Sequence, residues 1–228
     1  MFDPVNPRIE DIFRRDIAHS LSNKCRYSGH TRRFYSVAEH SVRVSWCLRS
    51  MGCSLAVQYW GLHHDDEEAY LVDLPTPLKA LPEFAWFKVI ATNLQSVICK
   101  AFALPIDEPP VVKEADRILL VTEKRDLMPP HDWSKQYVQV PLQDKIKAWG
   151  PKKAERIWLQ RCKELEDALQ GENREWRSGL QAGLQAEYQV LERLCCGWSK
   201  QRDSNRSVRK DSLSQRNGRT IPAKEKRL

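Results

Sequence analysis

The sequence lacks any apolar run long enough to cross a membrane. Its longest apolar stretches, such as Ile118 to Val121, fall far short of the roughly 20 residues that a membrane-spanning helix needs. The start of the chain, Met1 to Pro4, has neither the basic segment nor the apolar segment of a secretory signal. We therefore expect a cytoplasmic protein that has no membrane as a partner.

Cysteines at redox or metal-binding spacing are also absent. The seven cysteines are an odd number and form no C-x-x-C motif, and the adjacent Cys195 and Cys196 have no second pair nearby. This usage is typical of reduced thiols in the cytosol, and it argues against a disulfide framework.

Excess charge is missing from most of the chain. The formal net charge is +7, and the segment from Lys200 to Leu228, with ten basic and three acidic residues, accounts for all of it. The excess of basic over acidic residues therefore gives no reason to expect a nucleic-acid-binding surface on the rest of the protein. We predict a disordered basic tail over 199–228, able to make weak, salt-sensitive contact with nucleic acid.

The alternation of polar and apolar residues that is typical of a strand is likewise missing. Helical periodicity dominates to about residue 170, so we predict an all-α fold with a main domain over 1–170 and a further helix over 171–198. Pro75 and Pro77 close one of the predicted helices, because proline cannot continue a helix. The helices are expected at 11–21, from Ser36 onward, and at 55–71, 85–102, 110–127, 152–170 and 173–194.

Side-chain patterns predict how these helices begin and which faces they bury. Ser36 and Glu39 form a capping box, in which each side chain accepts a hydrogen bond from the other residue's backbone N–H. The helix that follows carries His40 beside its apolar face. Over 85–102, the side chains expected to face mostly inward are Trp86, Phe87, Ile90, Leu94, Val97 and Ile98.

Three of the predicted helices each direct an imidazole or a carboxylate toward the interior. The groups are His40, the pair His64 and Asp65, and Asp116, whose apolar neighbours place it on the buried side of its helix. Taken singly, a histidine such as His40 is more often a hydrogen-bonded core residue than a ligand, Asp116 could equally pair with a basic residue on its own helix, and the dipeptide at 64 and 65 is common by chance. Together, two nitrogens and two oxygens offset the cost of burying charge by binding a first-row cation, and they leave coordination positions open for catalysis.

Further charged residues extend this predicted site. On a helix, Glu68 would share the face of His64 and could act as a general base, with Asp73 following at the helix end. Lys79 and Arg26, on loops, are candidates to neutralise phosphate oxygens. For each basic residue, the alternative is a solvated surface charge.

Four segments carry a family likeness: DIAHSLS over 16–22, YSVAEHS over 35–41, LHHDDEEAYLVDLPTPLK over 62–79 and VKEAD over 112–116. Together they resemble the HD-domain phosphohydrolases of bacteria and their phages. The resemblance covers roughly residues 1–165, and the 5'-deoxynucleotidases and the phage dATP triphosphohydrolases are the most similar members. It implies an HD-domain helical bundle over 1–170 with a C-terminal helical extension and a disordered basic tail.

The resemblance also implies a role for each matching residue. The implied metal ligands are His40, His64, Asp65 and Asp116. The residues matched to positions beside the attacking water are Glu68 and Asp73. The implied substrate contacts are Lys79, for a phosphate, and the pair Arg26 and Tyr27.

Two positions depart from the family pattern. Asp66 stands where the family usually has a small residue, and Tyr27 stands where it often has tryptophan or phenylalanine. The first bears on the electrostatics around the ligands, and the second bears on which base is accepted. His19 and His63 are expected to pack in the core or to support the ligands.

The expected activity is hydrolysis of a deoxynucleotide, either the monophosphate to a nucleoside or the triphosphate with release of inorganic phosphates. The expected cofactor is a divalent cation, namely Mn, Co, Zn, Ni or Mg. One alternative is hydrolysis of a signalling nucleotide, and another is a non-catalytic HD-fold binding protein that acts through its basic tail. The presence of both Glu68 and Asp73 argues against the second alternative, because a protein that only binds does not need a water-activating carboxylate beside its ligands. A homo-oligomer is left open.

Overall fold

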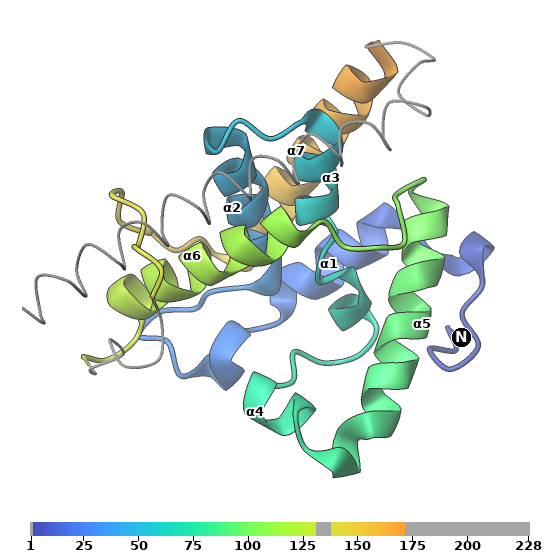
Figure 1. Ribbon diagram of the computed structural model, residues 1–228, viewed down its shortest axis with the longest axis horizontal. Coiled ribbons are helices and arrows are strands. Elements are labelled where there is room, and N and C mark those ends of the chain that lie inside the picture. The colour runs from blue at the N-terminus through green and yellow to red at the C-terminus, as the bar shows by residue number, and fades with distance from the viewer. Residues whose placement is uncertain (1, 131–137, 172–228) are drawn as a thin grey trace, which may run out of the picture. The chain divides into compact units, whose positions relative to one another are not determined.

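The described part of the chain is helical. The computed structural model describes residues 2–130 and 138–171, which all fall in one compact unit (Figure 1). Within these residues the only strand-like pairing is an isolated bridge between Cys25 and Ser36, so the all-α prediction is confirmed. None of the described helices is both long and apolar enough to cross a membrane. The predicted helix over 173–194 and the predicted tail over 199–228 lie outside the described residues.

The elements follow one another along the chain in a simple order. The α-helices are α1 (Arg14–Asn23), α2 (Val37–Ser50), α3 (Leu55–Leu62), α4 (Thr76–Lys79), α5 (Ala85–Ala101), α6 (Pro110–Leu127) and α7 (Pro151–Gly171). The short 3-10 helices are η1 (Ile9–Asp11), η2 (Arg26–Gly29), η3 (Asp66–Ala69) and η4 (Pro82–Phe84).

Three expected helices match the structure to within one residue at each end. They are α5, α6 and α7, predicted over 85–102, 110–127 and 152–170. α6 begins at Pro110, whose missing N–H would have had no partner in the first turn of a helix. Within α5 the predicted inward orientation of Trp86 is wrong, because this side chain is 60% exposed, whereas Phe87 is buried.

The helix expected over 55–71 is wrong. α3 ends at Leu62, His63 caps it, and a turn then leads into η3. The first helix is also shifted from the predicted 11–21, since α1 runs from Arg14 to Asn23. The acidic segment after His64 therefore lies in turns and not along one helix face.

The capping box at the start of α2 forms only in part. The Ser36 hydroxyl accepts from the backbone N–H of Glu39 at 3.1 Å, as predicted. The Glu39 carboxylate does not return to Ser36, however: it accepts from the Arg43 guanidinium at 2.7 Å and from the backbone N–H of Trp149 at 2.7 Å. Glu39 thus ties α2 to the segment before α7.

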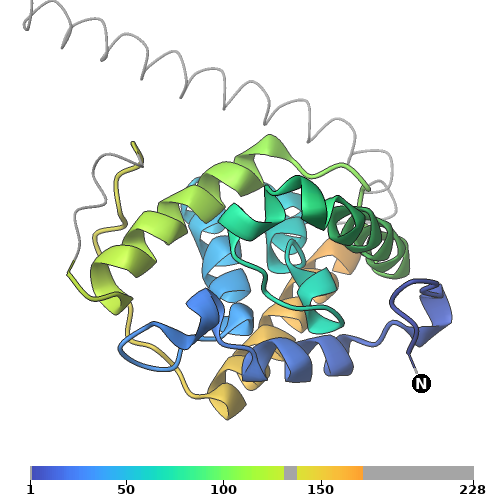
Figure 2. The same cartoon turned by 90° about the horizontal axis from the view of Figure 1, so that it is seen from below.

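α2 is the central helix of this unit. It packs against α1, α3, α6 and α7, and Figure 2 shows α2 and α3 between α6 and α7. α3 approaches α2 closely at Gly61, where a Cβ atom would collide with the Leu48 side chain. This close approach brings the end of α3, and with it His64, next to His40 on α2.

Candidate metal centre

His40, His64 and Asp65 form a group that could hold a metal ion. One ligand atom from each lies within 4.8 Å of the other two. The Nε2 atoms of the two histidines are 3.3 Å apart, and Asp65 Oδ2 lies 3.2 Å from Nε2 of His64 and 3.8 Å from Nε2 of His40. The fold therefore brings together three of the four predicted metal ligands.

Each imidazole is oriented by a hydrogen bond on its other nitrogen. Nδ1 of His64 donates to the backbone carbonyl of Gly61 at 2.9 Å, and Nδ1 of His40 donates to Glu123 Oε1 at 2.6 Å. A carbonyl or carboxylate oxygen only accepts, so each Nδ1 carries a hydrogen, and Nε2 of each ring is the nitrogen that faces the other ring and could bind a metal. Two imidazole nitrogens and a carboxylate oxygen at this spacing fit a first-row divalent cation.

Asp116, the fourth predicted ligand, lies at the edge of this group. Its Oδ1 is 3.1 Å from Nε2 of His40, and its side chain is 40% exposed. Asp116 therefore lies on the side of α6 that faces α2, as expected, but its side chain is only partly buried. A partly exposed carboxylate beside two buried imidazoles leaves this side of the group open to solvent.

Arg26 links the centre to a second carboxylate. Its Nη1 lies 3.2 Å from Asp65 Oδ2 and its Nε lies 3.6 Å from Glu123 Oε2, while its side chain is only 12% exposed. Burial alone would raise the pKa of Asp65, but His64 and Arg26 hold it well below its usual range. Asp65 is therefore an anion that is available to a cation.

Glu123 is the main site residue that sequence reasoning missed. It is fully buried on α6, and it accepts from Tyr27 Oη at 2.6 Å and Tyr35 Oη at 2.7 Å as well as from His40. Burial alone would raise its pKa, but the charges of His40 and Arg26 lower it. Glu123 thus fixes the orientation of His40 and joins the metal centre to the loop of Tyr27.

That loop carries the predicted substrate pair, Arg26 and Tyr27. Tyr27, Ser28 and Gly29 have φ values of 55°, 50° and 77°, which lie in the left-handed region that costs free energy for Tyr and Ser. The hydrogen bond from Tyr27 to Glu123 helps to hold this conformation. The Tyr27 ring centroid is 5.5 Å from the guanidinium of Arg26, so both side chains lie beside the metal centre.

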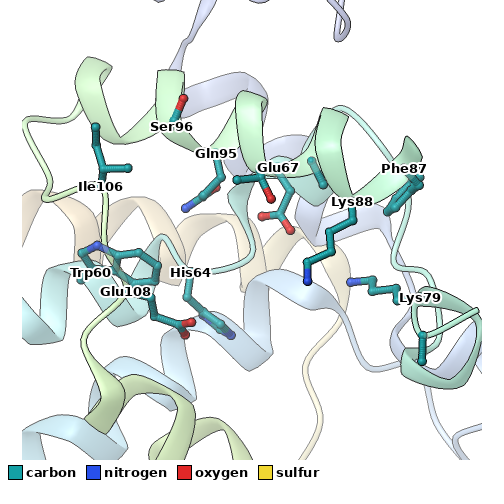
Figure 3. Close-up of a pocket in the computed structure, with 13 residues that line it drawn as sticks. Trp60, His64, Glu67, Lys79, Phe87, Lys88, Gln95, Ser96, Ile106 and Glu108 are labelled. Atoms are coloured by element: carbon teal, nitrogen blue, oxygen red, sulfur yellow. The ribbon is translucent and has the colours of Figure 1, made fainter. Parts of the chain in front are cut away.

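A cavity of about 460 Å³ opens beside His64 (Figure 3). Figure 3 shows the side chains of Lys79 and Lys88 both extending toward the middle of the cavity. Its other principal wall residues are Trp60, Glu67, Phe87, Gln95, Ile106 and Glu108. Apolar walls with a few convergent charged groups are typical of a small-molecule site.

The cavity is lined by two acidic residues that sequence reasoning did not single out, Glu67 and Glu108. Glu67 lines it, whereas the predicted base, Glu68, is not among the lining residues. Burial and the negative charge of Asp65 raise the pKa of Glu67 to about 8. Only the break between α3 and η3, which the helical periodicity did not indicate, gives Glu67 this position.

Glu68 is paired with the predicted phosphate contact. Its Oε1 accepts from Lys79 Nζ at 3.0 Å, and its Oε2 is buried without a hydrogen-bond partner among the described residues. Burial and the charges of Asp65 and Asp73 raise the pKa of Glu68 well above its ordinary value. Asp73 lies in the loop between η3 and α4.

Lys24 was also missed, and it organises the acidic segment. Its ammonium donates to the backbone carbonyls of Glu68, Ala69 and Leu71. Because one side chain binds three carbonyls, the segment from η3 onward is held against the end of α1. This contact positions Glu68 and is invisible to any local sequence pattern.

The two remaining predicted histidines differ in their surroundings. The packing role expected for His19 is wrong, since its side chain is 70% exposed and lies 3.4 Å from Glu155. The packing role expected for His63 is confirmed: it is fully buried, and its ring stacks on Phe102 with centroids 4.6 Å apart.

Comparison with known proteins gives relatives but no activity. No family model matches the chain. The chain is 42% identical over 127 residues to the uncharacterized protein YfdR of Escherichia coli K12, a region that covers 55% of this chain and 66% of that protein. It is 32% identical over 117 residues to an uncharacterized protein of Rhodobacter capsulatus, covering 50% of this chain and 59% of that protein. The chain thus spans less than two thirds of each relative, and neither name states a substrate.

Proposed function

We propose that this chain is a divalent-metal-dependent phosphohydrolase that acts on a deoxynucleotide. The observation that carries the proposal is the convergence of His40, His64 and Asp65 beside a cavity lined by Lys79 and Lys88. A nitrogen and oxygen donor set next to fixed cations suits the cleavage of a phosphate ester. The family resemblance of the motifs supports a nucleotide as the substrate.

The proposed metal ligands are His40, His64 and Asp65, with Asp116 as a fourth ligand from α6. A divalent cation, when bound, supplies Lewis-acid activation of water and of a phosphoryl oxygen. Asp116 is the exposed member of the set, so we place the reacting phosphate on its side of the centre.

Glu68 and Lys79 act as a pair in this proposal. Lys79 keeps Oε1 of Glu68 occupied, which leaves Oε2 as the atom that takes a proton from the attacking water. The raised pKa of Glu68 makes it a stronger base than an ordinary glutamate. The Lys79 ammonium, which is 36% exposed, is directed to the cavity and offsets the charge of the phosphate.

Arg26 and Tyr27 are proposed to receive the rest of the substrate. Arg26 is anchored on Asp65, so a phosphate oxygen at the centre comes within reach of its guanidinium. The Tyr27 hydroxyl is committed to Glu123, which leaves the face of its ring as the surface on which a base can stack. Asp73 remains a proposed support for the water.

A panel of deoxynucleotides tests the proposal. Purified protein incubated with Mn²⁺, Co²⁺ or Mg²⁺ should release phosphate from at least one of the common monophosphates or triphosphates. The activity should disappear with a chelator and return when metal is added back. Absence of hydrolysis across both sets with all three metals would overturn the proposal.

The products separate the two chemistries that the motifs leave open. Release of inorganic phosphate and a nucleoside from a monophosphate identifies a nucleotidase. Conversion of a triphosphate without activity on the monophosphate identifies a triphosphohydrolase. A cyclic or tetraphosphorylated nucleotide in the same panel covers the signalling alternative.

A further inference from the structure

Two buried side chains flank the metal-ligating pair in the sequence and bind each other. Nδ1 of His63 donates to Oδ2 of Asp66, and the side chains of both residues are fully buried. The backbone N–H of Asp66 also donates to the carbonyl of His63 at 3.3 Å. These two bonds close a short loop whose only internal residues are His64 and Asp65.

His63 is fixed from every side. Its ring stacks on Phe102 at 4.6 Å and meets the ring edges of Tyr59 at 4.6 Å and Trp158 at 5.2 Å. Its Nε2 lies 3.9 Å from Sγ of Cys162 on α7. A ring packed against α3, α5 and α7 in this way is a rigid anchor for whatever it binds.

His63 is also hydrogen-bonded to a residue of the cavity wall. Nε2 of Gln95 on α5 donates to the carbonyl of His63 at 2.8 Å, and Gln95 lines the cavity (Figure 3). The carbonyl of His63 therefore accepts two hydrogen bonds, one from the loop itself and one from the cavity wall. The loop bearing His64 and Asp65 is held between the core and the cavity.

We infer that His63 and Asp66 are positioning residues that form a clasp around the metal-ligating pair, presenting Nε2 of His64 and the Asp65 carboxylate in the geometry that binds a divalent cation. This inference rests on the proposed metal centre. A pair of ligands in a turn has no helix to hold it, so the entropy of ordering that turn would otherwise oppose metal binding. The clasp also gives a reason for an aspartate at 66, where the enzymes that the motifs resemble usually have a small residue.

The affinity of the metal-free protein for Mn²⁺, measured by calorimetry, tests the clasp without relying on activity. Asp66→Leu removes the acceptor while keeping a similar volume, and His63→Phe keeps the stacked ring but removes Nδ1. Each should weaken Mn²⁺ binding by about 10- to 100-fold. Asp66→Asn keeps an oxygen that accepts from His63 and should retain most of the affinity.

Cys162→Ala is the matched control. It disturbs the packing at the opposite nitrogen of His63 and lowers the melting temperature, but it leaves the bond to Asp66, so Mn²⁺ affinity should not change. If Asp66→Leu and His63→Phe bind Mn²⁺ as tightly as the parent, or if Cys162→Ala weakens binding as much as they do, the clasp is overturned. If the parent itself binds no Mn²⁺, the proposed metal centre fails, and the clasp fails with it.

Discussion

A His64→Ala protein should bind no stoichiometric divalent cation and should hydrolyse deoxynucleotides about 10³-fold more slowly or worse, because the cation contributes several kcal/mol to transition-state stabilisation. Nε2 of His64 is within 3.3 Å of both Nε2 of His40 and Oδ2 of Asp65, so it is the atom that the other two ligands share. Elemental analysis of the purified protein gives the metal content, and phosphate release gives the rate.

His19→Ala is the control for this substitution. His19 is exposed on α1 and makes no contact with the centre, so its removal should change neither metal content nor turnover. Full metal occupancy in His64→Ala would remove His64 from the ligand set.

Replacing Glu68 with glutamine should separate metal binding from catalysis. Glutamine retains an oxygen that can accept from Lys79, so packing and metal content should stay as in the parent. The amide cannot take a proton at the position of Oε2, so turnover should fall by about 10²-fold or more. The measurements are kcat and Mn²⁺ content on the same preparation.

Glu83→Gln, at an exposed glutamate of η4, provides the charge-matched control and should leave turnover unchanged. A rate for Glu68→Gln equal to that of the parent would assign the proton transfer to another group. Glu67, which lines the cavity, would then be the first residue to replace.

The long helices could be predicted because their signals are local. α6 begins at the second of two consecutive prolines and carries its buried residues at helical spacing, and α7 repeats an apolar residue every three or four positions from Ala154 to Leu169. The N-terminal cap of α2 could be predicted for the same reason, since Ser36 and Glu39 are three residues apart.

The break after Leu62 could not be predicted from periodicity. His63 leaves the helix because its ring packs between Phe102, which caps α5, and Trp158 of α7, and because its carbonyl binds Gln95, 32 residues away. The residue types over 63–69 are compatible with a helix, so only tertiary contacts decide against one. The prediction that Glu68 shares a helix face with His64 failed for this reason, although Glu68 still lies near Asp65.

Glu123 shows the same limit for a site residue. It precedes Lys124 and Arg125 in the sequence, a context typical of a solvated helix surface. Its three hydrogen-bond partners are Tyr27, Tyr35 and His40, which lie 96, 88 and 83 residues away. Residue type and motif spacing indicated the candidate ligands, whereas the groups that orient them depend on packing between distant segments.

Anomalous diffraction from crystals of the protein grown with Mn²⁺ tests the central claim most directly. The account predicts one strong peak bounded by Nε2 of His40, Nε2 of His64 and the carboxylate of Asp65, with Asp116 on its exposed side. A map with no peak at this position, from protein that hydrolyses deoxynucleotides in the same buffer, would contradict the account.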